Sequence, residues 1–214
     1  MKNWWILAVL AVGGMFLISR KSQAKSLPSG GDNVGNWKTS KVYVKYVDVA
    51  KALSTKHGVP ADLLLGQAAH ESGLNPFAVS KVGAAGISQF MPGTARGYGL
   101  KVLPGDMKTY NGKVREYPTT KDPALDERFD PSKLMDAQAR YLKQMYGSFG
   151  NWEDVLSGYL WGEAGWKKIL KNPTAYTTAI KTKKVLQNPD GKWTTSYAVK
   201  ILGNAKWLRD QGAF

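Results

Sequence analysis

Glu71 has the surroundings that best suit acid–base chemistry in this 214-residue chain. It lies near the end of an expected helix, after the stretch 63–69, whose residues are almost all apolar or small. The negative end of the helix dipole and the apolar neighbours both favour a protonated carboxyl group, so we expect a raised pKa. A carboxylic acid that is still protonated near neutral pH can act as a general acid. A solvated glutamate that ends a helix is the alternative, and this feature alone does not decide between the two.

Glycines follow Glu71 at ordered positions. The segment 83–92 reads Gly-Ala-Ala-Gly-Ile-Ser-Gln-Phe-Met-Pro. Because Gly83 and Gly86 carry no Cβ atom, the backbone there can approach a sugar ring closely or adopt a positive φ angle. The segment is therefore expected to form a loop that either meets a ligand or turns tightly.

Side chains suited to a saccharide lie in and around that loop. Ser80 offers a hydroxyl group, and Gln89 offers both a donor and an acceptor for an N-acetyl group. Phe90 and Met91 offer apolar surface for an acetyl group or a ring face. Tyr159 could hold the catalytic carboxyl group or an N-acetyl oxygen through its phenol. The last three are also common core residues, and packing remains the alternative for them.

These residues stand in motifs that resemble the lytic transglycosylase domain of the soluble-transglycosylase type, a relative of goose-type lysozyme. Glu71-Ser72-Gly73 matches the first motif, and residues 83–94 match the second, Gly-x-x-Gly-x-x-Gln-x-x-Pro-x-Thr. The third motif, Tyr-Asn-x-Gly, is matched in part within 157–162, because Leu160 stands where asparagine is usual. The segment 197–199 is similar to a later landmark of the family. Three ordered motifs in one chain make the resemblance specific.

The resemblance covers about residues 42–202 and implies a fold, a substrate and a site. The implied fold is mainly α, a lysozyme-like helical domain of the α+β lysozyme superfamily with a small β-hairpin. The implied substrate is the glycan strand of peptidoglycan, cleaved at the β-1,4 bond between N-acetylmuramic acid and N-acetylglucosamine with formation of a 1,6-anhydro ring. This lyase reaction needs no metal and no cofactor. The implied catalytic residue is Glu71, and the implied substrate-binding residues are Ser80, Gly86, Gln89, Met91 and Tyr159.

A single catalytic carboxyl group is unusual for glycosidic bonds, because most glycoside hydrolases use a pair. No second acid lies near Glu71 in the sequence. The transglycosylase reaction explains how one carboxyl group suffices, because that group donates a proton to the glycosidic oxygen and recovers one from the sugar's 6-hydroxyl group, without water. The distant acids are better interpreted as solvated loop charges or helix caps: Asp106, Asp122, Asp126, Glu127 and Asp130.

Three other functions compete with the lyase. The nearest is a goose-type muramidase, a hydrolase that would need a group to activate water. The second is a wall-binding or structural virion protein without catalysis. The third is a nucleic-acid binder, suggested by the net charge of +14. The lysines are spread over the chain instead of clustering with stacking aromatic residues, which argues against nucleic acid.

Cysteine and histidine usage excludes further chemistry. The chain has no cysteine, so disulfides and thiolate nucleophiles are excluded. Its two histidines, His57 and His70, do not support a histidine-rich metal centre. His70 adjoins Glu71 but faces another direction on a helix, and we interpret it as a packing or surface residue.

The elements that must position Glu71 are helices with glycine stops. One helix is expected from about Val42 to Gly58 and another from Pro60 to Gly73. Asn111-Gly112, flanked by β-compatible arms, predicts a hairpin with a type I′ turn. The hairpin could wall a sugar groove through its tyrosines or be an inert insertion. The further expected helices carry apolar stripes at 134–145 and 155–160 and include the tail at 195–208.

The N-terminal segment suggests a membrane anchor, and the expected organisation is an anchor at 1–25, a tether at 26–41 and the domain at 42–214. Residues 4–18 carry no charge. A helix of that length rises roughly 22 Å, short of the roughly 30 Å hydrocarbon core, but flanking residues could bring it close to spanning. The alternative is a cleaved signal peptide processed after Ser22-Gln23-Ala24.

Charge around the anchor predicts an unusual location. Arg20, Lys21 and Lys25 follow the apolar run, whereas Lys2 precedes it. The positive-inside tendency would then leave the domain on the cytoplasmic side, away from peptidoglycan. A phage protein carried in the virion or delivered to the envelope during genome entry fits this pattern. The expected location is therefore membrane-anchored and acting on the wall, with a periplasmic or secreted protein as the alternative after cleavage.

Overall fold

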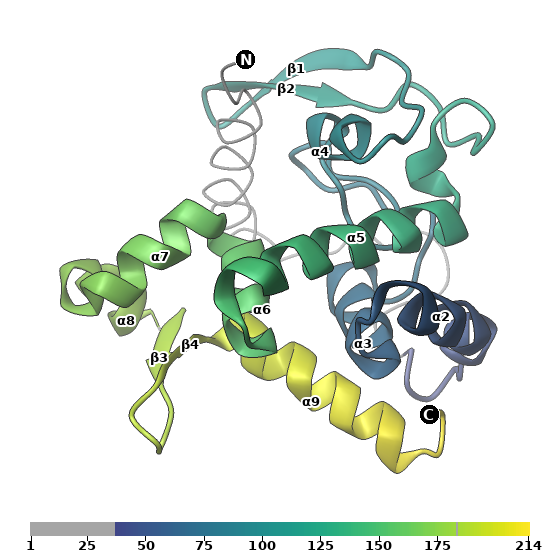
Figure 1. The fold of residues 1–214 in the computed structure, drawn as a ribbon. Helices are drawn as coiled ribbons and strands as arrows, with labels where there is room; N and C mark the ends of the chain where they lie inside the picture. Colours follow the sequence, from purple (N-terminus) through teal and green to yellow (C-terminus); the bar gives the residue numbers. More distant parts are fainter. Residues whose placement is uncertain (1–36, 183) are drawn as a thin grey trace.

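The computed structural model describes residues 37–182 and 184–214. The expected membrane segment at residues 4–18 and most of the expected tether lie outside the described residues. Within the described ranges, no helix combines the length and the apolar character needed to cross a bilayer. Helices dominate these ranges, and two short antiparallel strand pairs accompany them (Figure 1).

The order of the elements confirms a mainly helical domain with little β structure. The elements are α2 (Val44–His57), α3 (Ala61–Ser72), α4 (Pro92–Gly97), β1 (Asp106–Tyr110), β2 (Lys113–Tyr117), the 3-10 helix η2 (Glu127–Phe129), α5 (Pro131–Phe149), α6 (Trp152–Trp161), α7 (Glu163–Lys171), the 3-10 helix η3 (Pro173–Tyr176), α8 (Thr177–Lys181), β3 (Val185–Gln187), β4 (Trp193–Thr195) and α9 (Ser196–Asp210).

The helix ends follow the glycine signals. α2 ends at Gly58 with φ 68°, and α3 ends at Gly73 with φ 66°, both in the left-handed region that glycine adopts without strain. α5 begins after Asp130, whose carboxylate accepts hydrogen bonds from the backbone amides of Ser132 and Lys133 at 2.9 and 3.1 Å. The interpretation of Asp130 as a helix cap is therefore confirmed.

The first strand pair is the expected hairpin, and the second was missed. β1 and β2 pair antiparallel, and Asn111 and Gly112 between them have φ angles of 50° and 70°, as a type I′ turn requires. β3 and β4 also pair antiparallel. The sequence did not predict this second pair, because strands of three residues are too short to show a recognisable alternation.

α3 lies at the centre of the core and carries its buried residues in an unbroken run. Its stretch 62–69 is buried throughout, and α2, α5 and α9 pack around it (Figure 1). Gly66 allows the close approach of α9, because a Cβ atom there would lie only 3.0 Å from the Ala205 amide nitrogen. This contact brings the first turn of α9 beside the last turn of α3.

The folded unit begins before the expected boundary at residue 42. Trp37 is only 7% exposed and packs edge-on against Tyr43 and Trp207, with ring centroids 6.3 and 5.2 Å apart. Trp37 therefore belongs to the core beside the end of α9, although the expected tether ran to residue 41.

Candidate active site

Glu71 is in the last turn of α3 and is half-buried. The Tyr197 hydroxyl, from the first turn of α9, donates a hydrogen bond to Oε1 of Glu71. Tyr197 is only 2% exposed, so its ring is fixed by packing. The carboxyl group is thus carried by one helix and oriented by a side chain from another, which restricts it to one position.

Ser72 links α3, the helix that carries Glu71, to the loop at residues 83–92, which we call the glycine loop. Its hydroxyl donates to the carbonyl oxygen of Ile87 over 2.8 Å and accepts from the Asn75 amide over 3.1 Å. The serine of the Glu-Ser-Gly motif therefore has a structural explanation, because it couples the loop to the end of α3. The glycine that follows supplies the left-handed residue that ends the helix.

Ser80 and Gln89 hold the backbone of the loop. Ser80 Oγ accepts from the amides of Val82 and Ala84 at 3.3 and 3.0 Å. Gln89 Nε2 donates to the carbonyl oxygens of Ala78 and Gly86 at 3.1 and 2.9 Å. The amide hydrogens of Gln89 are therefore directed into the loop. The expectation that Ser80 and Gln89 bind substrate stays a prediction.

Gly86 was expected either to let a sugar ring approach the backbone or to adopt a positive φ angle, and in the structure protein atoms pack against it. Its φ angle is 80°, and a Cβ atom would lie 1.8 Å from the Arg128 carbonyl oxygen and 2.5 Å from Leu134 Cδ2. Arg128 is itself buried with Asp126 at 2.6 Å, and its Nη1 donates to the Gly83 carbonyl over 3.1 Å. The structure therefore supports the positive-φ explanation for Gly86 and places a buried ion pair behind it.

Met91 and Tyr159 are both buried. Met91 packs with Val82, Ala84 and the hairpin residue Tyr110. Tyr159 donates to the Ser88 carbonyl over 3.1 Å. Its ring stacks on that of Tyr197 at a centroid distance of 6.3 Å and an interplanar angle of 7°. Tyr159 therefore supports the tyrosine that bonds to Glu71, and its predicted contact with substrate stays a prediction.

The β1–β2 hairpin is attached to the same loop through both of its expected tyrosines. Tyr110 packs on the Met91 cluster, and the Tyr117 hydroxyl donates to the Lys81 carbonyl. Glu116 also pairs with Arg96 of α4, and this hydrogen bond lowers the pKa of the Glu116 carboxyl group. The hairpin is thus part of the structure around the loop and not a loose appendage.

A comparison with known families now assigns the chain. The model of the family described as Transglycosylase SLT domain matches residues 48–181, which is more than half of the chain. The chain belongs to the transglycosylase SLT domain family. The resemblance seen in the sequence motifs is therefore confirmed.

Curated relatives of this SLT domain are longer proteins. The membrane-bound lytic murein transglycosylase C of Edwardsiella ictaluri is 31% identical over 105 residues, which cover 49% of this chain and 25% of that protein. The soluble lytic murein transglycosylase of Escherichia coli is 30% identical over 106 residues, which cover 50% of this chain and 14% of that protein. The chain therefore matches a quarter or less of the length of these relatives.

Solved structures support the fold. The 70-kDa soluble lytic transglycosylase of Escherichia coli matches with a TM-score of 0.54 at 22% identity, over 78% of this chain and 24% of that chain. Its complex with bulgecin A matches with a TM-score of 0.54 at 21% identity, over 84% of this chain and 28% of that chain. At this identity the matches show the fold alone, and they confirm the expected lysozyme-like class.

Two residues around Glu71 were not predicted from the sequence. Tyr197 stood out only as part of a family landmark, with no contact to Glu71 expected. Gln67 was not expected to have a role, and its Nε2 donates a hydrogen bond to the Tyr197 hydroxyl over 2.9 Å. Gln67 is the polar member of an otherwise apolar or small stretch, and a buried amide of this kind needs a partner. His70 packs edge-on against Tyr197 at 5.1 Å, as its packing interpretation expected.

The distant acids of the SLT domain have structural partners. Asp126 caps the 3-10 helix η2, because its carboxylate accepts a hydrogen bond from the Arg128 amide at 3.1 Å. It is also 1% exposed in its ion pair with Arg128, so of the two expected explanations the helix cap holds and the solvated charge does not. The remaining partners are Lys133 for Glu127 at 2.6 Å, Lys108 for Asp106 at 3.4 Å, the Ala124 amide for Asp122 at 2.9 Å and the α5 amides for Asp130.

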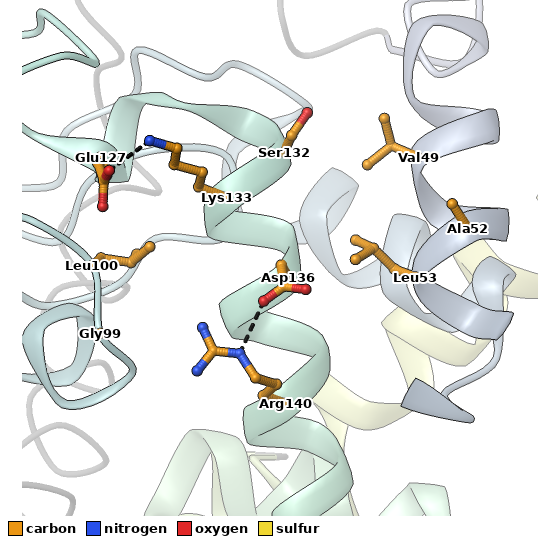
Figure 2. A pocket seen from close by; sticks show the side chains of 10 residues that line it. All are labelled: Val49, Ala52, Leu53, Gly99, Leu100, Glu127, Ser132, Lys133, Asp136 and Arg140. Atoms are coloured by element: carbon orange, nitrogen blue, oxygen red, sulfur yellow. Dashed lines mark hydrogen bonds and ion pairs between the residues drawn. The ribbon is translucent and has the colours of Figure 1, made fainter. Parts of the chain in front are cut away.

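A separate cavity of about 590 Å³ lies between α2 and α5 (Figure 2). Its charged side chains pair with one another, Lys133 with Glu127 at 2.6 Å and Arg140 with Asp136 at 2.9 Å. Burial would raise the pKa of Asp136, but hydrogen bonds from Lys56, His57 and Arg140 outweigh it and hold that pKa below its usual range. The cavity is lined by Val49, Ala52, Leu53, Gly99, Leu100, Glu127, Ser132, Lys133, Asp136 and Arg140, a set without the predicted site residues.

Proposed function

We propose that this SLT domain is a peptidoglycan lytic transglycosylase with Glu71 as its catalytic residue. The observation that carries the proposal is the half-buried Glu71 carboxyl group, fixed at the end of α3 by the Tyr197 hydroxyl. The two curated relatives described above are both named lytic murein transglycosylases, and murein is peptidoglycan. The predicted substrate-binding residues Ser80, Gly86, Gln89, Met91 and Tyr159 all belong to, or contact, the loop that Ser72 ties to α3.

The proposed reaction uses the carboxyl group twice. Neutral Glu71 donates its proton to the oxygen of the glycosidic bond between N-acetylmuramic acid and N-acetylglucosamine. The N-acetyl carbonyl oxygen of the muramic acid stabilises the cation that develops as the bond breaks. The ionised carboxylate then removes the proton of the same sugar's 6-hydroxyl group, and that oxygen closes the 1,6-anhydro ring. The carboxyl group ends in its starting state, and no water is consumed.

A single carboxyl group favours this lyase over a goose-type muramidase. A hydrolase usually needs a second carboxylate about 5–9.5 Å from the first to act as nucleophile or to activate water. The acids that the sequence offered for this role are held by other partners in the described structure, as Asp126 is by Arg128. A wall-binding or structural virion protein without catalysis does not explain an oriented carboxyl group at the motif position.

The test is digestion of purified peptidoglycan by the full-length chain, with the products weighed by mass spectrometry. We expect fragments with 1,6-anhydro ends, each lighter by one water than a reducing end. Glu71→Gln should keep the fold and lose product release by several orders of magnitude. Glu163→Gln is the matched control, because Glu163 pairs with the exposed Lys167 on α7 and its loss should leave the rate unchanged.

Two outcomes would contradict the proposal. Release of reducing ends alone would identify a muramidase. Parent-like activity of Glu71→Gln would remove Glu71 from the reaction.

The proposed location is the bacterial envelope, with residues 4–18 as a membrane anchor. Three observations support this proposal. Residues 4–18 carry no charge, and the segment after them, with Arg20, Lys21 and Lys25, is more positive than the segment before them, with Lys2. The relative from Edwardsiella ictaluri is named as membrane-bound. This charge pattern fits a phage protein that cleaves peptidoglycan locally, carried in the virion or delivered during genome entry. Protease mapping of virions and of host membrane vesicles tests the location, and a mature N-terminus at Lys25 would contradict the anchor.

A further inference from the structure

A chain of buried polar side chains ends on Glu71. Ser88, Gln138 and Gln67 come from the glycine loop, α5 and α3, and each is 0% exposed. The Ser88 hydroxyl donates to Gln138 Oε1 over 2.7 Å, and Gln138 Nε2 donates to Gln67 Oε1 over 2.8 Å. Gln67 Nε2 donates to the Tyr197 hydroxyl over 2.9 Å, and Tyr197 donates to Glu71 Oε1. We call Gln138, Gln67 and Tyr197 the glutamine chain.

A backbone carbonyl sets the direction of the glutamine chain. Gln138 Nε2 also donates to the Leu64 carbonyl oxygen over 3.1 Å, and a carbonyl can only accept. The amide group of Gln138 must therefore face Leu64 and Gln67 with its NH₂. Gln67 must then receive this bond with Oε1, which leaves its own NH₂ facing Tyr197. The Tyr197 oxygen thus accepts from Gln67, and its hydrogen points to Glu71.

We infer that Gln67 and Gln138 are positioning residues that fix which oxygen of Glu71 transfers the proton. Because Tyr197 is held as a donor, Oε1 of Glu71 accepts a hydrogen bond in both the neutral and the ionised state. A neutral carboxyl group has one hydrogen, and this hydrogen must then be on Oε2. The inference rests on the proposed function: Oε2 gives its proton to the glycosidic oxygen and later takes the proton of the 6-hydroxyl group.

The energetics of burial support a specific role for the two amides. An amide placed in an apolar interior is destabilising unless its groups are hydrogen-bonded, and an apolar side chain of equal size would fill the space without that requirement. Each bond in a directional chain also polarises the next, so the effect of Gln138 extends to the Tyr197 hydroxyl.

The competing explanation is that the Gln67–Tyr197 hydrogen bond only stabilises the packing of α3 against α9. A second hydrogen bond between the same helices allows a comparison. Asn204 Nδ2 donates to the Gly66 carbonyl oxygen over 3.2 Å. This bond joins α9 to α3 as the Tyr197–Gln67 bond does, and Gly66 adjoins Gln67. Asn204→Leu therefore removes a helix–helix hydrogen bond without breaking the glutamine chain.

The test compares full-length Gln67→Met and Asn204→Leu with the parent chain. Methionine keeps the approximate volume of glutamine and removes its donor and acceptor. Without that donor, the neutral Glu71 carboxyl group can place its proton on Oε1 and donate to Tyr197. The neutral form gains stability, so the alkaline limb of the pH profile of kcat should move upward by roughly half a pH unit, with kcat lower by about tenfold and KM little changed. Asn204→Leu should leave the limb in place.

A second readout does not depend on activity. The carboxyl carbon of Glu71, labelled with carbon-13 and assigned by its loss in Glu71→Gln, is titrated by NMR in the parent and both variants. We expect its midpoint to rise in Gln67→Met only. Gln138→Met, which removes the group bonded to Leu64, should raise the midpoint in the same direction and carries the test if Gln67→Met does not fold.

The outcomes separate the two claims. If the parent releases no anhydro product, the proposed function fails, and the NMR titration still tests the glutamine chain. Equal midpoints in the parent, Gln67→Met and Gln138→Met would overturn the inference. An equal shift in Asn204→Leu would do the same, because it would assign the effect to helix packing.

Discussion

Replacing Gly86 with alanine decides whether this predicted binding residue serves the ligand or the fold. Alanine would place a Cβ atom 1.8 Å from the Arg128 carbonyl oxygen, at a backbone φ angle of 80°. Relieving such an overlap requires a backbone shift of more than about 1 Å, and the positive φ angle adds about 1 kcal/mol of its own. The shift would also strain the buried Arg128–Asp126 pair, which holds the carbonyl of Gly83.

These effects together predict a loss of about 3–5 kcal/mol in the free energy of unfolding for Gly86→Ala. For a domain of this size the loss corresponds to a Tm lower by roughly 10 °C, measured by differential scanning calorimetry. Gly93→Ala is the matched control, because no neighbouring atom lies within 4 Å of its Cβ position, and its stability should stay within about 0.5 kcal/mol of the parent.

The refuting result for Gly86→Ala is a parent-like Tm. If the variant melts with the parent but its KM for glycan strands rises, Gly86 contacts substrate as the sequence first suggested, and the packing argument is wrong.

Two further predictions concern single polar groups. Tyr197→Phe keeps the stacked ring and removes the hydroxyl that donates to Glu71. We expect kcat for muropeptide release to fall by roughly 10- to 100-fold and the alkaline limb of its pH profile to move to higher pH, because the ionised carboxylate loses a hydrogen bond. An unchanged alkaline limb would contradict the assigned hydrogen bond. Asp136→Asn removes a carboxylate whose pKa is lowered by hydrogen bonds from Lys56, His57 and Arg140. The variant should lose about 1–2 kcal/mol of stability above pH ~4. The difference should shrink as the pH falls below that value, because protonation removes the same interaction from the parent. Denaturant unfolding at several pH values measures this difference, and its persistence in acid would contradict the ion-pair explanation.

Local signals predicted much of the scaffold. Gly58 and Gly73 end helices because a left-handed residue at that point is a matter of local backbone sterics. Asn111-Gly112 predicted its hairpin for the same reason, since a type I′ turn needs two residues with positive φ angles. The position of Glu71 at a helix end followed from the same kind of pattern.

Contacts between distant residues could not be predicted in this way. Gln138 meets Gln67 across 71 positions of sequence, and Tyr197 meets Glu71 across 126. Periodicity places each residue on its own helix and says nothing about which faces meet. Gly86 illustrates the same gap, because both of its expected roles need a glycine, and its contact with the Arg128 carbonyl could not be predicted from the sequence.

The buried acid Asp126 shows a related limit. An acid in a charged loop suggests solvent exposure, and an arginine two positions later does not by itself indicate that both side chains are buried. Burial of both side chains depends on the glycine loop that packs over them.

The central claim, one carboxyl group that cleaves a glycan without water, is tested most directly by isotope labelling. Purified peptidoglycan is digested by the full-length chain in heavy-oxygen water, and the new ends are analysed by mass spectrometry. We expect anhydro ends that contain no heavy oxygen in the parent, and no new ends in Glu71→Gln. Incorporation of one heavy oxygen at each new reducing end would contradict the account, because it would show that water attacks the glycan.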